Sequence, residues 1–374
     1  MTASADLRRK LRLTAEILFF GVLPLMYVIS MYRSNFTDAG GFFDLHVFWR
    51  AGQDVLAGHS PYPSPHEITL GRENNFVYPA PMALLFAPLG LASFQLAAAV
   101  FTSILFAAIA GSLWLLDVRD WRCYGAALLP MTTMTAISTG TVGPLILLGA
   151  AALWRFRDRK AVAAVIACAV VVAKLFMWPL LIWLAATGRL RTAVTALVAA
   201  VLVSITGWVA LGFAGFTTYP SMLSTLTRVE GGRSYSLYAL FQSAGASPTS
   251  ARLALLILGA ALIAAIILLA RRPGGDERSF CLSLAAALLL SPIVWAHYLI
   301  LLIIPIALAR PRLSPLWLAP LAFWLATYTA HNHGSTSRII LALAITLAIF
   351  VRCDMREKPV LAHAPVEPLQ AEAA

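Results

Sequence analysis

Residues 251–270, ARLALLILGAALIAAIILLA, decide the class of fold. Arg252 is the only charged residue in this stretch. Twenty residues of α-helix measure about 30 Å, which is the thickness of the hydrocarbon core of a bilayer. The stretch therefore predicts a transmembrane helix. The residues that follow, RRPGGDER at 271–278, are strongly charged, as expected where a helix leaves the membrane.

The same composition extends over the whole chain. Of its 374 residues, 60% are apolar and 12% are charged, whereas a soluble domain has roughly 25% charged residues. A water-soluble globule cannot bury so much apolar surface, so we expect an all-α polytopic membrane protein. A soluble enzyme, a disordered chain and a coiled coil are excluded. The net charge of +11 indicates basic cytoplasmic loops in contact with membrane lipids, and no nucleic-acid partner.

Twelve apolar stretches predict about twelve transmembrane helices, several of them short or broken. The first, 13–32, follows the basic RRKLR at 8–12 and has no small-residue cleavage site, so we interpret it as an uncleaved helix. The second, 80–116, is long enough for one helix or two. The others are 123–138, 142–154, 161–173, 175–187, 192–213, 251–270, 279–292, 295–309, 314–331 and 338–351.

Basic clusters between these stretches predict the orientation. If all of them face the cytoplasm, they hold 20 of the 28 Lys and Arg residues, as the positive-inside rule requires. Both termini are then cytoplasmic, in a multi-pass protein of the cytoplasmic (inner) membrane. The clusters are RRKLR at 8–12, Arg119 with Arg122, RFRDRK at 155–160, GRLR at 188–191, 271–278, Arg310 with Arg312, and RCDMREK at 352–358.

Two segments are too short to hold two full crossings, yet run from one cytoplasmic cluster to the next. The first, 161–187, must rise and return as a hairpin with Lys174 near its apex, and Pro179 marks the break. The second, 279–309, behaves alike, with SPIVWAH and Pro292 at its apex. Short legs indicate a thin or water-filled outer half of the protein, which suits a cavity.

The outer side then carries two long loops, 33–79 and 213–250. A single membrane domain covers 1–358, and the Pro- and Ala-rich tail, 359–374, is expected to be disordered and cytoplasmic. The first outer loop holds five of the 17 acidic residues, which indicates acid–base chemistry at the outer face. They are Asp38, Asp44, Asp54, Glu67 and Glu73.

The first outer loop also predicts an amphipathic helix at the membrane surface. In FFDLHVFWRAGQDVLAGHSPYP, residues 42–63, the apolar positions 45, 48, 49, 52, 55 and 56 have helical spacing. Gly58 is expected to end this helix. Asp44 lies at its start, where one interpretation is a helix N-cap and the other is a catalytic carboxylate. The two roles are compatible.

Three further polar residues lie in apolar surroundings, and each has two interpretations. Tyr78, in NNFVYPAPM, is either an interfacial anchor or a substrate contact. Lys174, in VVVAKLFMWPLL, either extends to the interface or provides a cation for an anionic group such as a lipid phosphate. His297, in SPIVWAHYLI, is either bonded to a neighbouring helix or part of the site.

Other signatures of catalysis or metal binding are weak or missing. The chain has no P-loop, no HExxH and no GxSxG motif. His331 and His333 are close in sequence, but a His-x-His turn is more often a solvated loop than a metal site. The four cysteines have no CxxC spacing, so no thiolate metal site is expected.

Taken together, these segments resemble the polyprenyl-phosphate-mannose-dependent mannosyltransferases of glycosyltransferase family 87. The resemblance implies a GT-C-type membrane fold, a sugar donor carried on a polyprenyl phosphate, and a glycolipid or glycan acceptor at the outer face. The aspartate after the first helix is the family's catalytic base, which corresponds to Asp44, and the histidine of the SPxxWxH segment corresponds to His297. The matching segments are 44–62, 76–90, 174–181, 233–241 and 291–302.

The expected reaction is an inverting transfer of a hexose, for which the resemblance favours mannose. Asp44 would take the proton of the acceptor hydroxyl, and Lys174, helped by Arg50 or His297, would stabilise the leaving phosphate. Tyr78 and His46 are further candidates for substrate binding. No cofactor or metal is required, because fixed cations can neutralise the phosphate. The alternatives are a transporter or flippase for lipid-linked sugars and a non-catalytic membrane subunit.

Overall fold

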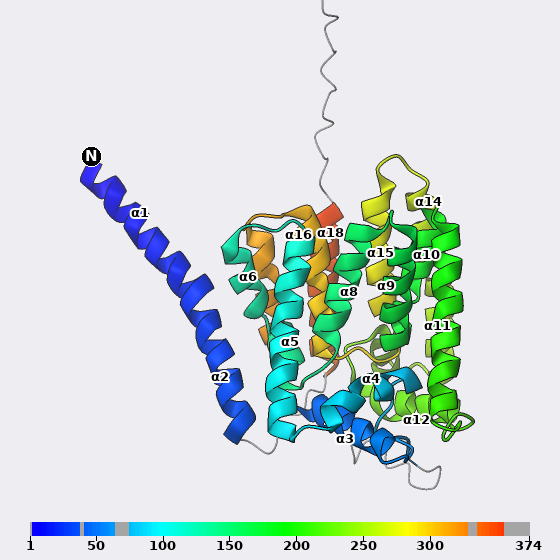
Figure 1. Cartoon of the computed structure of the whole chain (residues 1–374). Helices are drawn as coiled ribbons and strands as arrows, with labels where there is room; N and C mark the ends of the chain where they lie inside the picture. The colour runs from blue at the N-terminus through cyan, green and yellow to red at the C-terminus, as the bar shows by residue number, and fades with distance from the viewer. Residues whose placement is uncertain (1, 38–40, 64–74, 328–334, 355–374) are drawn as a thin grey trace, which may run out of the picture.

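The structure is a computed structural model that describes residues 2–37, 41–63, 75–327 and 335–354. Within these residues every regular element is a helix and none is a strand. Most helices stand side by side in a bundle, from which the N-terminal helix diverges (Figure 1). The predicted tail, 359–374, lies outside the described residues, as do Asp38, Glu67 and Glu73 of the first predicted outer loop.

Five helices of the described chain are long and apolar enough to cross a membrane. If the pair α7 (Met131–Ser138) and α8 (Gly143–Phe156), bent by 116°, forms one span, there are up to six. The chain is therefore a multi-pass membrane protein. The five are Ala5–Arg33, which joins α1 (Thr2–Ile17), η1 (Leu18–Val22) and α2 (Leu23–Thr37), and then α5 (Phe94–Leu115), α11 (Leu190–Ala210), α14 (Pro248–Ala270) and α18 (Thr336–Asp354).

Shorter helices account for the other apolar stretches. The stretch 80–116 holds two helices, α4 (Ala80–Gly90) and α5, and the Ser93 side chain caps α5 by accepting a hydrogen bond from the N–H of Leu96. The remaining short elements are α6 (Trp121–Leu128), α9 (Lys160–Ala173), η2 (Leu175–Met177), α10 (Pro179–Ala186), α15 (Gly275–Leu290), η4 (Ala296–Leu302), α16 (Ile303–Ala309), η5 (Pro315–Ala322) and α17 (Phe323–Thr327).

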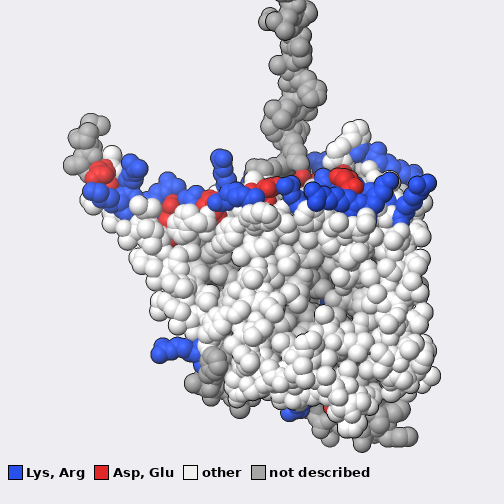
Figure 2. Space-filling view, viewed as in Figure 1, with Lys and Arg blue, Asp and Glu red and all other residues white. Residues whose placement is uncertain are grey.

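Lys and Arg side chains gather along one edge of the bundle, above a broad band in which charged side chains are sparse (Figure 2). Ion pairs near this edge join segments that are distant in sequence, such as Arg122 with Glu16 at 3.1 Å and Arg155 with Asp117 at 3.5 Å. We call this region, formed by residues 117–122, 155–160, 189–191, 271–278 and 310–313, the basic edge. It consists of clusters that the positive-inside rule predicts to lie on one side of the membrane.

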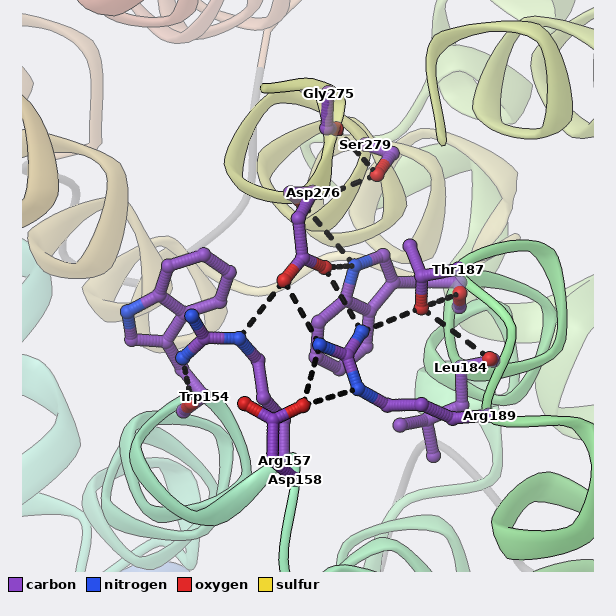
Figure 3. Close-up of polar contacts among 10 residues, drawn as sticks. Trp154, Arg157, Asp158, Leu184, Thr187, Arg189, Gly275, Asp276 and Ser279 are labelled. Carbon is purple, nitrogen blue, oxygen red and sulfur yellow. Dashed lines mark hydrogen bonds and ion pairs between the residues drawn. The ribbon is translucent and has the colours of Figure 1, made fainter. Parts of the chain in front are cut away.

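One network at the basic edge ties three helix ends together (Figure 3). Asp276, at the start of α15, accepts hydrogen bonds from Arg157 at 2.8 Å and from Arg189 at 3.0 and 3.1 Å. Arg189 also pairs with Asp158 at 2.8 Å. Because Asp158 precedes α9 and Arg189 follows α10, the two ends of segment 161–187 meet at this edge. The segment is therefore a hairpin.

The apex of this hairpin lies far from the basic edge. Lys174 interrupts the helix in an extended conformation (φ −145°, ψ 101°), and Pro179 begins α10 four residues after the short η2 turn starts at Leu175. The fourteen residues of α9 place Lys174 about 20 Å along the helix axis from Lys160.

A layer of short helices, α3 (Phe43–Leu56), α4 and α12 (Tyr219–Glu230), lies at the end of the bundle opposite the basic edge (Figure 1). The predicted amphipathic helix is α3, and its buried residues are Leu45, Phe48, Ala51 and Gly52. Phe48 stacks on Phe86 of α4 with ring centroids 4.2 Å apart. A Cβ atom on Gly52 would lie 2.5 Å from the Phe86 carbonyl oxygen, so glycine permits this close packing. Gly58 (φ +75°) follows the end of α3, as expected.

Candidate functional site

Asp44 lies in the first turn of α3, but it is not the N-cap. The helix begins at Phe43, and the N-cap residue is Phe42, whose φ is +61° and which makes no side-chain capping bond. The start of the helix is instead fixed by the loop after α7: the N–H of Phe42 donates to Ser138 O at 3.0 Å, and that of Asp44 to Thr139 O at 2.8 Å. The predicted capping role is therefore wrong, and the Asp44 carboxyl is not occupied by helix capping.

Asp44 as a whole residue is half-buried. Within the described chain it makes no hydrogen bond or ion pair with another side chain. Burial raises its pKa to about 6, and the positive charge of Lys174 opposes that rise. A carboxyl with this pKa is mostly ionised at neutral pH and still basic enough to accept a proton.

Lys174 lies between two tyrosines from different parts of the chain. Its ammonium donates hydrogen bonds to the hydroxyl of Tyr78 at 2.9 Å and to the hydroxyl of Tyr298 at 2.8 Å. Tyr78 precedes α4, and Tyr298 belongs to η4. Lys174 forms no ion pair with Asp44 within 4.0 Å in the described structure, although the two charges interact. A gap therefore separates the anion from the cation.

His297 is buried beside these residues, with 5% of its surface exposed. Its ring lies edge-on to Tyr298 with centroids 4.7 Å apart, and it is close enough to Lys174 to feel its charge. Its Nδ1 atom has no hydrogen-bond partner among the described residues. The interpretation that His297 is bonded through Nδ1 to a neighbouring helix therefore has no support in these residues.

The loop between α7 and α8 connects the two sides of the site. Thr139 binds the backbone of Asp44, and a Cβ atom on Gly140 (φ +69°) would lie 2.7 Å from Cβ of Leu45. At the other end of the loop, a Cβ atom on Gly143 would lie 3.3 Å from the carbonyl oxygen of His297. The segments that bear the site are the start of α3, the residues before α4, the break after α9, and η4. We call the five residues that they bring together the Asp44–Lys174 cluster: Asp44, Tyr78, Lys174, His297 and Tyr298.

Two predicted site residues lie on another face of α3. His46 stacks on Phe94 of α5, with ring centroids 3.5 Å apart, and burial lowers its pKa. Arg50 is exposed. No described contact joins either side chain to the Asp44–Lys174 cluster, so the structure does not bring them to the reacting groups.

Sequence reasoning missed Tyr298, although it directly follows His297 in SPIVWAHYLI. A tyrosine in an apolar helix is common, and only its contact with Lys174 distinguishes it. The described residues contain no group of three or more His, Cys, Asp or Glu side chains suited to hold a metal. His331 and His333 lie outside them.

Comparison with known proteins identifies the family. The sequence model of glycosyltransferase family 87 matches residues 76–295, which are more than half of the chain. This chain belongs to that family. The match includes Tyr78 and Lys174, begins after Asp44 and ends two residues before His297. No curated protein and no solved structure matches the chain. A family 87 protein with several apolar helices is a membrane glycosyltransferase, which has a sugar donor and an acceptor as its substrates.

Proposed function

We propose that this family 87 member transfers a hexose, with mannose as the favoured sugar, from a polyprenyl phosphate to a glycolipid or glycan acceptor. The transfer takes place at the outer face of the cytoplasmic membrane and inverts the anomeric configuration. The observation that carries the proposal is the Asp44–Lys174 cluster. It holds an ionisable carboxyl and an ammonium near each other without pairing them.

The chemistry needs a base on one side of the anomeric carbon and a cation on the other. Asp44 accepts the proton of the acceptor hydroxyl, whose oxygen forms a bond to the anomeric carbon. The bond from that carbon to the phosphate oxygen breaks, and its electron pair stays on the phosphate, whose new charge Lys174 stabilises. A phosphate is a good leaving group without a protein acid, so one carboxylate suffices.

The other predicted residues have supporting roles in this proposal. The Nδ1 atom of His297 is free of partners in the described structure and can bond a sugar hydroxyl or a phosphate oxygen. Arg50 and His46, on the other face of α3, would contact parts of the acceptor beyond the reacting hydroxyl. Fixed cations do the work that a metal would do, and no cofactor enters the proposed reaction.

The membrane arrangement is also part of the proposal. We propose a GT-C-type fold with about twelve transmembrane helices. Several of them are short, and α9 and α10 form the two legs of one hairpin. The basic edge then faces the cytoplasm by the positive-inside rule, with both termini. The Asp44–Lys174 cluster lies toward the opposite side, because the hairpin of α9 and α10 starts and ends at the basic edge.

The reaction can be tested with purified protein in lipid vesicles. A radiolabelled polyprenyl-phosphate mannose is supplied with a panel of glycolipid acceptors, and the product is identified by mass spectrometry. We expect label in a lipid-linked glycan and release of polyprenyl phosphate. Transport without transfer, measured as donor that becomes accessible on the other side of the vesicle, would contradict the proposal and favour a flippase. No transfer and no transport would favour a non-catalytic subunit.

A further inference from the structure

Three hydrogen-bond donors in the Asp44–Lys174 cluster have no acceptor among the described residues. The Lys174 ammonium has three N–H groups, and two of them point to Tyr78 and Tyr298. Each phenol oxygen accepts a bond from Lys174, so its own hydrogen remains to be donated. No described residue accepts a bond from either phenol. One N–H and two O–H groups are therefore available to a ligand.

The three donors are also held in place by neighbouring residues. Tyr78, Lys174 and Tyr298 are half-buried, so part of the surface of each residue is exposed. The ring of Tyr298 stacks on Phe176, with centroids 5.0 Å apart at an angle of 22°. The carbonyl oxygen of Tyr78 accepts a 2.7 Å hydrogen bond from the hydroxyl of Tyr62. Donors that are fixed before the ligand arrives need no reorganisation when charge develops.

We propose that Tyr78, Lys174 and Tyr298 form a three-donor cradle for the phosphate of a polyprenyl lipid, and that Tyr298 is a catalytic residue. This inference rests on the proposed function. In the donor, the phosphate is a diester with two non-bridging oxygens and one negative charge. When the bond to the anomeric carbon breaks, the bridging oxygen becomes a third terminal oxygen and the phosphate gains a second negative charge.

The number of donors therefore fits the leaving group better than the bound donor. Two of the three can bond the non-bridging oxygens before reaction. The third finds its acceptor only as the bridging oxygen takes up the electron pair of the broken bond. An interaction that strengthens in the transition state raises kcat and has little effect on KM. The proton of the acceptor hydroxyl meanwhile passes to Asp44, so atoms and charges balance.

The cradle can be tested by two measurements on purified protein in lipid nanodiscs. The first is binding of polyprenyl phosphate, with the unphosphorylated polyprenol as the comparison ligand. The second is the kcat and donor KM of transfer. The variants are Tyr298→Phe and Tyr78→Phe, each of which removes one hydroxyl. Tyr124→Phe is the matched control, because among the described residues the hydroxyl of Tyr124 donates to Val118 O at the basic edge and not to the cluster.

We expect Tyr298→Phe to lower kcat by about 100- to 1,000-fold, the range for removal of one fixed donor to a developing anion, and to change donor KM by less than about threefold. Affinity for polyprenyl phosphate should fall at least tenfold, while affinity for polyprenol stays unchanged. Tyr78→Phe should likewise weaken binding of polyprenyl phosphate and lower kcat/KM for transfer, and it tests the cradle independently if Tyr298→Phe does not fold. Tyr124→Phe should behave like the wild type.

The outcomes separate the cradle from the reaction. Tyrosine-dependent binding of polyprenyl phosphate without any transfer would support the cradle and overturn the proposed reaction. Normal transfer together with wild-type binding and kcat in both tyrosine variants would support the reaction and overturn the cradle.

Discussion

Replacing Lys174 with methionine should raise the pKa of Asp44 above its present value of about 6. Burial raises the pKa of this carboxyl, and the positive charge of Lys174 is the influence that lowers it. Methionine has a similar length and no charge, so the substitution removes the opposing influence and keeps the burial. Because a base must be ionised to act, transfer should then be lost at a higher pH as the solution is acidified.

The size of the shift follows from the separation of the two charges. They form no ion pair within 4.0 Å, so a separation of about 5–10 Å is reasonable. With an effective dielectric constant of about 20, charges at that separation interact by about 2–3 kcal/mol. This energy corresponds to a rise of about 1–2 pKa units. Solvent in the site screens the charges, so we expect a shift near one unit.

The shift can be measured without turnover by infrared difference spectroscopy. The carbonyl band of the protonated Asp44 carboxyl is followed against pH and identified by its absence in Asp44→Asn. Where Lys174→Met keeps some activity, the acidic limb of kcat/KM against pH gives a second measurement. Lys174→Arg keeps the charge and should titrate like the wild type. An Asp44 titration that stays at the same pH in Lys174→Met would refute the electrostatic coupling of the two residues.

Three further predictions concern stability, measured as thermal unfolding of detergent-purified protein. Asp44→Asn should raise the free energy of unfolding near pH 7 by about 1–3 kcal/mol, because a carboxyl with a raised pKa destabilises the folded state once it is ionised. The gain should vanish on acidification through about pH 6 toward pH 4. Equal effects at pH 4 and pH 7 would contradict this prediction. Gly52→Ala should lower the free energy of unfolding by about 2–4 kcal/mol, since its Cβ would lie 2.5 Å from a carbonyl oxygen of α4. Gly58→Ala is the comparison, because Gly58 has φ +75° and open space around it, and it should lower that free energy by only about 1–2 kcal/mol. Asp276→Ala should lower the free energy of unfolding by about 2–4 kcal/mol, because it leaves two half-buried arginines without their shared partner. Asp117→Ala should lower it by less than about 1 kcal/mol, because the ion pairs of Asp117 are exposed.

Much of the fold follows from patterns in the chain. The spacing of apolar residues places α3 correctly, because a helix that lies on a protein surface must repeat its buried face every three or four residues. Charge predicts the hairpin of 161–187, since two basic clusters only 27 residues apart cannot lie on the same side unless the chain between them returns. The pair Arg189–Asp158 at 2.8 Å is the contact that closes this hairpin.

The start of α3 could not be predicted from nearby residues. Asp is a common N-cap, but here the α7–α8 loop, about 95 residues later, supplies the carbonyls that bind the first N–H groups. The sequence did contain a warning about His46 and Arg50. At 100° per residue, they lie about 200° and 240° around the helix from Asp44, so one face of α3 cannot present all three side chains.

The composition of the site depends on tertiary contacts that sequence spacing does not reveal. Lys174 can be singled out because an intramembrane cation is rare. Tyr298 cannot, because nothing in SPIVWAHYLI distinguishes it from an ordinary tyrosine of an apolar helix. Its position 2.8 Å from Lys174 depends on how η4 packs against the hairpin of 161–187.

Asp44 as the base of a glycosyl transfer is the central claim, and one comparison tests it most directly. Wild-type and Asp44→Asn proteins are reconstituted in vesicles with a radiolabelled polyprenyl-phosphate sugar and an accepted glycolipid, and single-turnover transfer is measured beside donor binding. We expect Asp44→Asn to bind the donor within about threefold of the wild type and to transfer at least about 100-fold more slowly, as loss of a general base requires. Transfer by Asp44→Asn at close to the wild-type rate would contradict the account.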